Sequence, residues 1–213
     1  MTEEPRTRPR FRGVSHKWAF FASLGAGAAL MVDASGARAR FAAGIFAASV
    51  AAMFGASALY HRVTWPTPER RRLFAKLDHA AIYLLISGTY TPFALLVLEG
   101  AWRWSLLIVV WTGALAAIVL KIVWGDTPKW VPATIGIGLG WIGVVAFPQM
   151  TEIGVAGMTL IVIGGLCYTV GAVVYARRRP DPFPRSFGYH EVFHLLVIAA
   201  AACQYVAIAF FVL

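Results

Sequence analysis

The segment HEVFH, residues 190–194, carries residue types from which zinc sites are built. His190 and His194 are four residues apart, so on a helix they lie on one face and can bind the same metal ion. The segment also matches the H-E-x-x-H pattern of zinc metalloproteases, in which the glutamate is the general base. Because it opens a strongly apolar run, three interpretations are open: a protease's zinc site, a different zinc site, or two histidines at a membrane surface.

A third metal ligand is available if other apolar runs end at the same depth. His61 closes the second run, in SALYH, and Asp78 begins the third, in LDH. In an up-and-down helical bundle, the end of the second helix and the starts of the third and seventh lie in one layer. We therefore predict a metal site formed by His61, His190 and His194, with a fourth position left for water.

Asp78 and Ser57 are the candidate catalytic residues. Asp78 could orient or deprotonate a water whose pKa a metal ion lowers to about 7. Ser57 lies one helical turn from His61 and could hydrogen-bond that water or a substrate carbonyl oxygen. Glu191 is the competing base, but the sequence lacks the further acidic or LDG-type element that accompanies such motifs in membrane proteases. We expect Glu191 to be an interfacial or supporting carboxylate.

Two other histidines are weaker candidates. His16 stands at the start of the first apolar run and is expected at the membrane interface, although it could also enter the ligand shell. His79 projects about 100° away from Asp78 on a helix and is expected to pack against the site or support it. Every one of these polar residues could be interfacial, yet ionisable groups inside membrane spans usually face the bundle interior. The sequence therefore favours a metal site.

The whole chain has the composition of a membrane protein. Of its 213 residues 59% are hydrophobic and 14% are charged, and the mean hydropathy is +0.69. Soluble domains average about 25% charged residues. The net charge of +9 comes from clusters between apolar runs, a pattern typical of membrane topology rather than of a nucleic-acid surface. Cys167 and Cys203 lie inside apolar runs and are expected to be buried thiols.

Seven apolar runs are long enough to cross a bilayer as helices. They predict an all-α, seven-helix membrane domain over 16–213, preceded by a basic cytoplasmic tail over 1–15 that is expected to be disordered. A signal peptide is the alternative interpretation of the first run. The runs cover 16–34, 41–61, 79–98, 103–124, 131–149, 155–176 and 188–212.

The basic residues predict the orientation of the bundle. Sixteen of the 19 lie at 6–17, at 62–77, beside the 4–5 connection or at 177–185, so the N-terminus is expected in the cytoplasm and the C-terminus outside. In the fifth run, Gly136 and Gly140 form a G-x-x-x-G pattern. We expect it to mediate close helix packing, with a gate or a lipid-facing groove as the alternative.

Three segments, SALYH, LDHAAIYLLISGTYTPF and HEVFHLLVIAAAACQY, resemble signature segments of the bacterial hemolysin III family within the progestin and adipoQ receptor superfamily. The resemblance implies seven helices, a cytoplasmic N-terminus and Zn²⁺ bound by three histidines near the inner leaflet of the bacterial cell (inner) membrane. The S-x-x-x-H motif falls on Ser57 and His61, the third-span aspartate on Asp78, and the H-x-x-x-H motif on His190 and His194. The asparagine that often precedes the first-span histidine in relatives is missing from RGVSH.

The resemblance implies two kinds of function. The family name refers to cytolysis, and receptor relatives are associated with ceramide hydrolysis. Our leading hypothesis is a zinc-dependent hydrolase acting on a lipid amide or ester, ceramide-like in class, with a membrane lipid as substrate. The alternative is a non-enzymatic membrane protein with structural zinc that acts in signalling, lipid homeostasis or pore formation. A third possibility, an intramembrane protease, requires Glu191 as its base.

Overall fold

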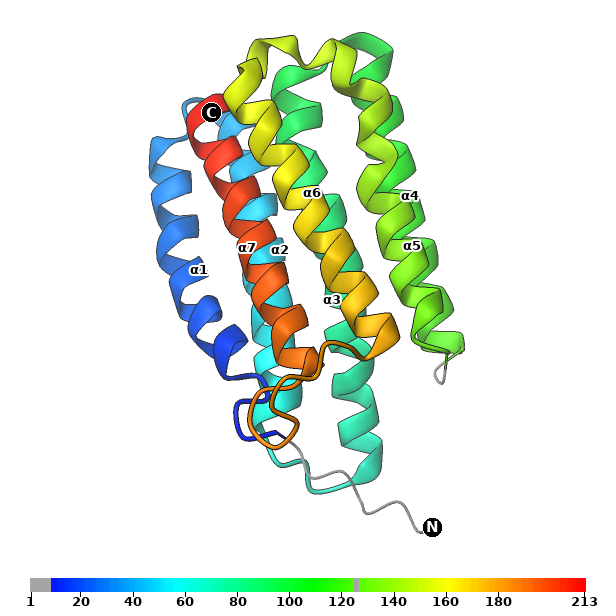
Figure 1. The fold of residues 1–213 in the computed structure, drawn as a ribbon. Coiled ribbons are helices and arrows are strands. Elements are labelled where there is room, and N and C mark those ends of the chain that lie inside the picture. Colours follow the sequence, from blue (N-terminus) through cyan, green and yellow to red (C-terminus); the bar gives the residue numbers. More distant parts are fainter. Residues whose placement is uncertain (1–8, 125–126) are drawn as a thin grey trace.

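The computed structural model describes residues 9–124 and 127–213, which form a bundle of seven α-helices (Figure 1). Helices adjacent in sequence pack against each other, and α1 contacts α7 to close the ring. Three short helices extend this set, with the π-helix η1 continuing α3, and η2 and η3 joining α5 to α6. The bounds are α1 Val14–Asp33, α2 Ala37–Arg62, α3 Pro68–Pro92, η1 Phe93–Val97, α4 Gly100–Val123, α5 Trp130–Trp141, η2 Ile142–Gln149, η3 Thr151–Ile153, α6 Gly154–Arg177 and α7 Tyr189–Phe211.

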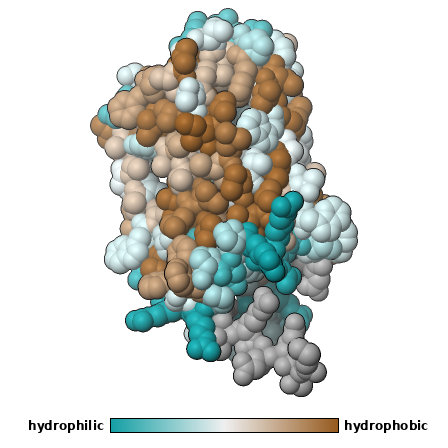
Figure 2. All heavy atoms as spheres, in the orientation of Figure 1, coloured by the Kyte–Doolittle hydropathy of each residue, from teal (hydrophilic) through white to brown (hydrophobic). Residues whose placement is uncertain are grey.

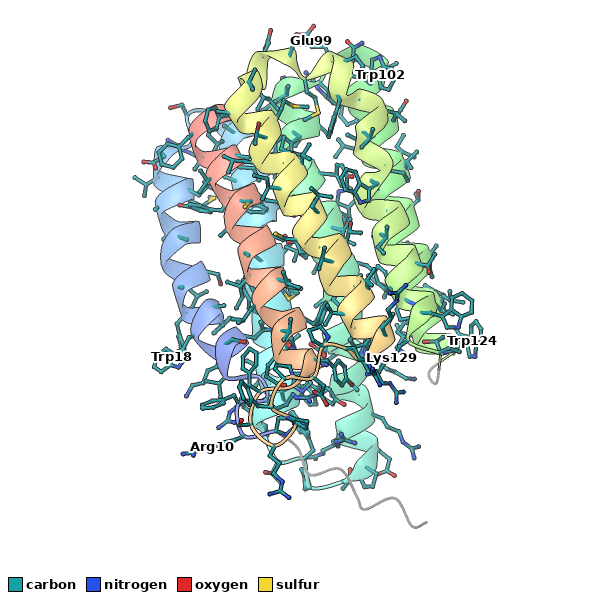
Figure 3. The ribbon with its side chains drawn as sticks, in the orientation of Figure 1. Arg10, Trp18, Glu99, Trp102, Trp124 and Lys129 are labelled. Atoms are coloured by element: carbon teal, nitrogen blue, oxygen red, sulfur yellow. The ribbon has the colours of Figure 1, made fainter. Side chains whose placement is uncertain are left out.

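The surface of this bundle is that of a membrane protein. Within the described residues, six helical segments are long and apolar enough to cross a membrane, and the 20-residue α1 packs beside α2 and α7 as the seventh helix. Figure 2 shows hydrophobic residues across the middle of one face and hydrophilic residues toward its ends. Exposed Trp102 and Trp124 lie at opposite ends of the bundle (Figure 3). Along α4 they are about 33 Å apart, close to the thickness of a bilayer core. The predicted all-α membrane bundle is confirmed.

Helix α3 begins earlier than its apolar run predicts, at Pro68 rather than at residue 79. Pro68 occupies the first helical turn, where its missing N–H costs nothing, and the Thr67 hydroxyl accepts a hydrogen bond from the Arg70 N–H at 3.3 Å. These local signals start the helix within a polar segment, and Figure 1 shows α3 projecting beyond its neighbours at this end. Asp78 consequently lies inside a continuous helix rather than at its first residue.

The N-terminal tail is partly ordered. Residues 1–8 lie outside the described part of the chain, so the disorder predicted for them has no test here. The Arg10 N–H donates to the Arg185 carbonyl and the Phe11 N–H to the Ser186 carbonyl, both at 3.1 Å, and α1 begins at Val14. These backbone bonds attach residues 10 and 11 to the α6–α7 loop, just before α1 begins.

Close helix packing occurs at other glycines than the predicted pair. A Cβ atom added at Gly140 would have no neighbour within 4 Å, and one at Gly136 would only reach Ile86 at 4.0 Å. At Gly88, by contrast, an added Cβ would overlap the side chain of Ser49 on α2. The expectation of close packing at the G-x-x-x-G pattern was wrong, and both of its glycines instead line the internal cavity described below.

Replacing Gly88 by alanine is expected to destabilise the protein, because the added methyl group has no room between α2 and α3. Overpacking of this kind typically costs about 1–3 kcal/mol. Gly138→Ala is the matched control, since its Cβ would have no neighbour within 4 Å and alanine is the better helix former. Thermal unfolding of both variants in detergent measures the effect. Equal unfolding temperatures would contradict the α2–α3 contact.

The orientation of the bundle in the membrane remains a prediction from charge. A reporter fused after Leu213 is expected to be external, and one inserted within 177–185 cytoplasmic, because basic loops stay on the cytoplasmic side. Activity of paired reporters, each functional in only one compartment, measures this. Two reporters on the same side would contradict the predicted crossing of α7.

Candidate metal site

Three histidines from two helices meet at one end of the bundle. His61 lies in the last turn of α2, and His190 and His194 lie in the first two turns of α7. The Nε2 atoms of His61 and His190 are 3.1 Å apart, and the candidate ligand atoms of the three residues lie within 4.8 Å of one another. All three side chains are buried. The predicted common depth of these residues is thus observed.

The geometry of the cluster is compatible with a tetrahedral metal ion. Zn–N bonds of about 2.0–2.1 Å place tetrahedral ligands roughly 3.4 Å apart. The 4.8 Å limit leaves the widest pair at most about 1.4 Å to close, which side-chain rotation can supply. The Nδ1 atom of His194 is buried without a hydrogen-bond partner, as expected of a nitrogen available to a metal ion. Three buried imidazoles can therefore hold a metal, and imidazole ligands suit zinc.

Asp78 and Ser57 lie beside the histidines, as predicted. An Asp78 carboxylate oxygen, Oδ2, is 3.6 Å from the Nε2 atom of His61. Ser57 is buried one turn before His61 on α2, and its hydroxyl donates a hydrogen bond to the Asp78 carboxylate. The packing of α2 against α3 thereby brings a carboxylate from a second helix next to the histidine cluster.

Glu191 has a structural environment of its own. Its Oε2 atom accepts a hydrogen bond from the Gly188 N–H at 2.8 Å, which caps the start of α7. Its Oε1 atom is 2.6 Å from the Arg12 Nε atom, in an ion pair whose alignment is not that of a hydrogen bond. Glu191 is 2% exposed and does not line the cavity. It is a supporting carboxylate, buried rather than interfacial, and it joins the N-terminal segment to α7.

His16 is buried beside the histidine cluster rather than exposed at the surface of the bundle. It is 2% exposed, and its ring stacks on His194 with centroids 3.7 Å apart and planes at 9°. The backbone at Gly13 lies directly against His61. A side chain at Gly13 would not fit, because its Cβ atom would lie 2.5 Å from the His61 Cβ, and the φ of +76° also favours glycine. This close approach brings α1 over the cluster. Stacking then fixes the ring plane of His194.

His79 packs beside the site, as expected. Its Nδ1 atom is 2.6 Å from the Ala75 carbonyl oxygen, and its Nε2 atom is 3.1 Å from the Tyr175 hydroxyl. Tyr175 also packs its ring against His190 and is a residue that sequence reasoning missed. Arg12 was missed as well. Its only sequence signal is a position just before the first apolar run, which it shares with other tail arginines.

An internal cavity of about 170 Å³ leads away from the histidines. His190, His194, Asp78 and Ser57 line one end, while residues near the opposite end of the bundle, such as Met150, line the other. Most of the intervening lining is apolar, and it comes largely from α3, α5, α6 and α7. The arrangement places polar, metal-binding chemistry at the head of a long apolar space.

About one zinc ion per chain is expected to co-purify with the protein, and His61→Ala is expected to deplete it, because two imidazoles hold zinc less tightly than three. Elemental analysis by mass spectrometry measures the content. His79→Ala is the matched control, since both nitrogens of that ring have partners outside the cluster. Full zinc content in His61→Ala would contradict the three-histidine site.

Comparisons with known proteins identify the family of this chain. The profile of the family described as Haemolysin-III related matches residues 5–205. Hemolysin-3 of Bacillus cereus is 35% identical over 170 residues, which cover 79% of this chain and 74% of the relative. The adiponectin receptor protein of Drosophila melanogaster is 30% identical over 182 residues, which cover 76% of this chain and 40% of the receptor. The monocyte to macrophage differentiation factor of Homo sapiens is 26% identical over 176 residues, covering 79% of this chain and 69% of that protein. With nearly its whole length matched and three of its histidines gathered in one buried cluster, the chain belongs to the Haemolysin-III related family.

Proposed function

We propose that this protein is a zinc-dependent membrane hydrolase that cleaves the amide or ester bond of a lipid, ceramide-like in class. One observation carries the proposal: two histidines of the three-histidine cluster, together with the Asp78 carboxylate, line one end of a largely apolar cavity. A lipid can place its tail along the apolar lining and its carbonyl group among the polar residues. From the charge distribution we assign this end to the inner leaflet of a bacterial cell membrane.

The polar residues have separate roles in this proposal. Zinc, when bound, lowers the pKa of a water and polarises a carbonyl group. Asp78 accepts the proton of the attacking water and passes it to the leaving group. Ser57 orients Asp78 by donating to its carboxylate. In a substrate complex, the same hydroxyl could instead donate to the substrate carbonyl oxygen, the role expected from the sequence.

Glu191 is a poor candidate for the base. A general base must come within about 2.6–3.2 Å of the proton it takes, or reach it through one water. Both oxygens of Glu191 already face other groups, Gly188 and Arg12, outside the cavity lining. A protease-like mechanism would require this carboxylate to leave the helix cap and the ion pair together.

Asp78→Asn is expected to retain zinc and to lose most hydrolysis, by about 10²–10⁴-fold, because the amide cannot accept a proton. Turnover of a fluorescent ceramide and of a fatty-acid nitrophenyl ester measures activity beside zinc content. Glu191→Gln is the matched carboxylate control. It is expected to lower stability by weakening the ion pair, with activity per folded molecule near that of the wild type.

Two results would contradict this assignment. An inactive Glu191→Gln beside an active Asp78→Asn would favour the protease-like alternative. Wild-type protein that holds zinc yet turns over neither probe, with histidine variants that only lose stability, would favour a non-enzymatic membrane protein with structural zinc.

A further inference from the structure

The cavity contains a second set of unsatisfied polar atoms, far from the histidines. The Tyr168 hydroxyl on α6 and the Gln204 Oε1 atom on α7 are buried without a hydrogen-bond partner, and both residues line the cavity. Gln204 as a whole is only 6% exposed. The great majority of buried side-chain polar atoms have a partner, so two unsatisfied atoms on residues that line one apolar cavity mark a candidate binding site.

Other hydroxyl groups in the cavity lining are satisfied by the protein itself. The Tyr90 hydroxyl bonds to the Gly140 carbonyl at 2.5 Å, and the Thr169 hydroxyl donates to the Gly165 carbonyl at 2.8 Å. The Thr89 hydroxyl donates to the Leu85 carbonyl at 2.8 Å. Tyr168 and Gln204 differ from these residues because the Tyr168 hydroxyl and the Gln204 Oε1 atom have no hydrogen-bond partner among the described residues.

The packing of α6 on α7 holds the two residues in place. The Gln204 Nε2 atom donates to the Ile161 carbonyl at 3.3 Å, which fixes the amide and leaves Oε1 as the unused acceptor. Gly164 allows this approach, since a Cβ atom there would lie 2.8 Å from that Nε2 atom. Tyr168 lies one helical turn along α6 from Gly164, on the same face. A donor and an acceptor from adjacent helices thus lie at neighbouring levels of the cavity.

The distance of Gln204 from the histidines determines which part of a bound lipid would lie beside it. Gln204 follows His194 by ten residues on one continuous helix, which is a rise of about 15 Å. A chain with its head group at the histidines would reach this level in the middle of a long acyl tail. The placement of the head group rests on the proposed function, whereas the polar atoms themselves do not.

We infer that Tyr168 and Gln204 form a second binding subsite, which recognises a hydroxyl group in the middle of a long acyl chain. A hydroxyl both accepts and donates, so it can accept from the Tyr168 O–H and donate to the Gln204 Oε1 atom. A keto oxygen would satisfy Tyr168 alone, and a plain methylene would satisfy neither. The chemical class selected is therefore a mid-chain hydroxylated lipid.

Binding of oleate and ricinoleate to the zinc-loaded, full-length protein in nanodiscs tests this subsite without any need for turnover. The two acids share chain length and double bond, and ricinoleate adds one mid-chain hydroxyl. Wild type is expected to bind ricinoleate more tightly, on the order of tenfold, as new hydrogen bonds to buried groups allow. Oleic acid hydroxylated beside its carboxylate is the positional control and should show no gain that depends on Tyr168 or Gln204.

Gln204→Leu and Tyr168→Phe are expected to remove the preference for ricinoleate, because they keep shape while deleting the hydrogen-bonding atoms. Oleate affinity in each variant reports whether the cavity is intact. Thr89→Val is the matched control, since its hydroxyl is already satisfied by the protein, and it should keep the preference.

Three results separate the possible failures. Equal affinity of wild type for oleate and ricinoleate would overturn the subsite and leave the hydrolase proposal standing. A preference that persists in the double variant Tyr168→Phe/Gln204→Leu would overturn the assignment of these residues. Absence of binding by either acid would overturn the acyl-chain cavity, and with it both the subsite and the lipid substrate of the proposed function.

Discussion

The histidine end of the bundle depends on one constraint: its imidazole rings are buried, so they must find their hydrogen-bond partners or a metal ion inside the protein. An unsatisfied buried polar group costs about 1–3 kcal/mol. A metal ion held by His61, His190 and His194 would coordinate one nitrogen of each ring. The neighbouring polar groups are satisfied in pairs, with Ser57 on Asp78 and the Gly188 N–H on Glu191. The histidine cluster and the paired polar groups around it thus form one polar layer at this end of the bundle.

The sequence predicts this layer because its determinants are local. Four-residue spacing places His190 and His194 on one face, and the ends of consecutive apolar runs place His61 at the same depth. The helical bundle follows for the same reason, since backbone groups in hydrocarbon must bond within their own segment.

What the sequence misses depends on contacts between distant segments. The burial of His16 needs the passage of Gly13 against His61, and the role of Glu191 needs Arg12, neither of which a periodicity can show. The early start of α3 follows from the Thr67 cap, a signal that hydropathy ignores.

The cavity is lined on one side by α5 and η2, which together are the least buried of the candidate membrane spans among the described residues. Gly136 and Gly140 of α5 line it without a side chain. Close glycine contacts occur elsewhere, at Gly88 and Gly164, where they hold α2 to α3 and α6 to α7. Glycine therefore has two opposite effects in one bundle. On some helices it closes the distance to a neighbour, and on α5 it leaves space for a ligand.

The N-terminal segment links the tail of the chain mechanically to the metal-binding end. Its backbone bonds at Arg10 and Phe11 attach it to the α6–α7 loop, and Arg12 binds the carboxylate that caps α7. Force or binding applied to this short segment would reach the first turn of α7, which carries His190, without passing through the rest of the bundle. A tag attached to this segment would therefore pull directly on the helix that carries two histidines of the cluster.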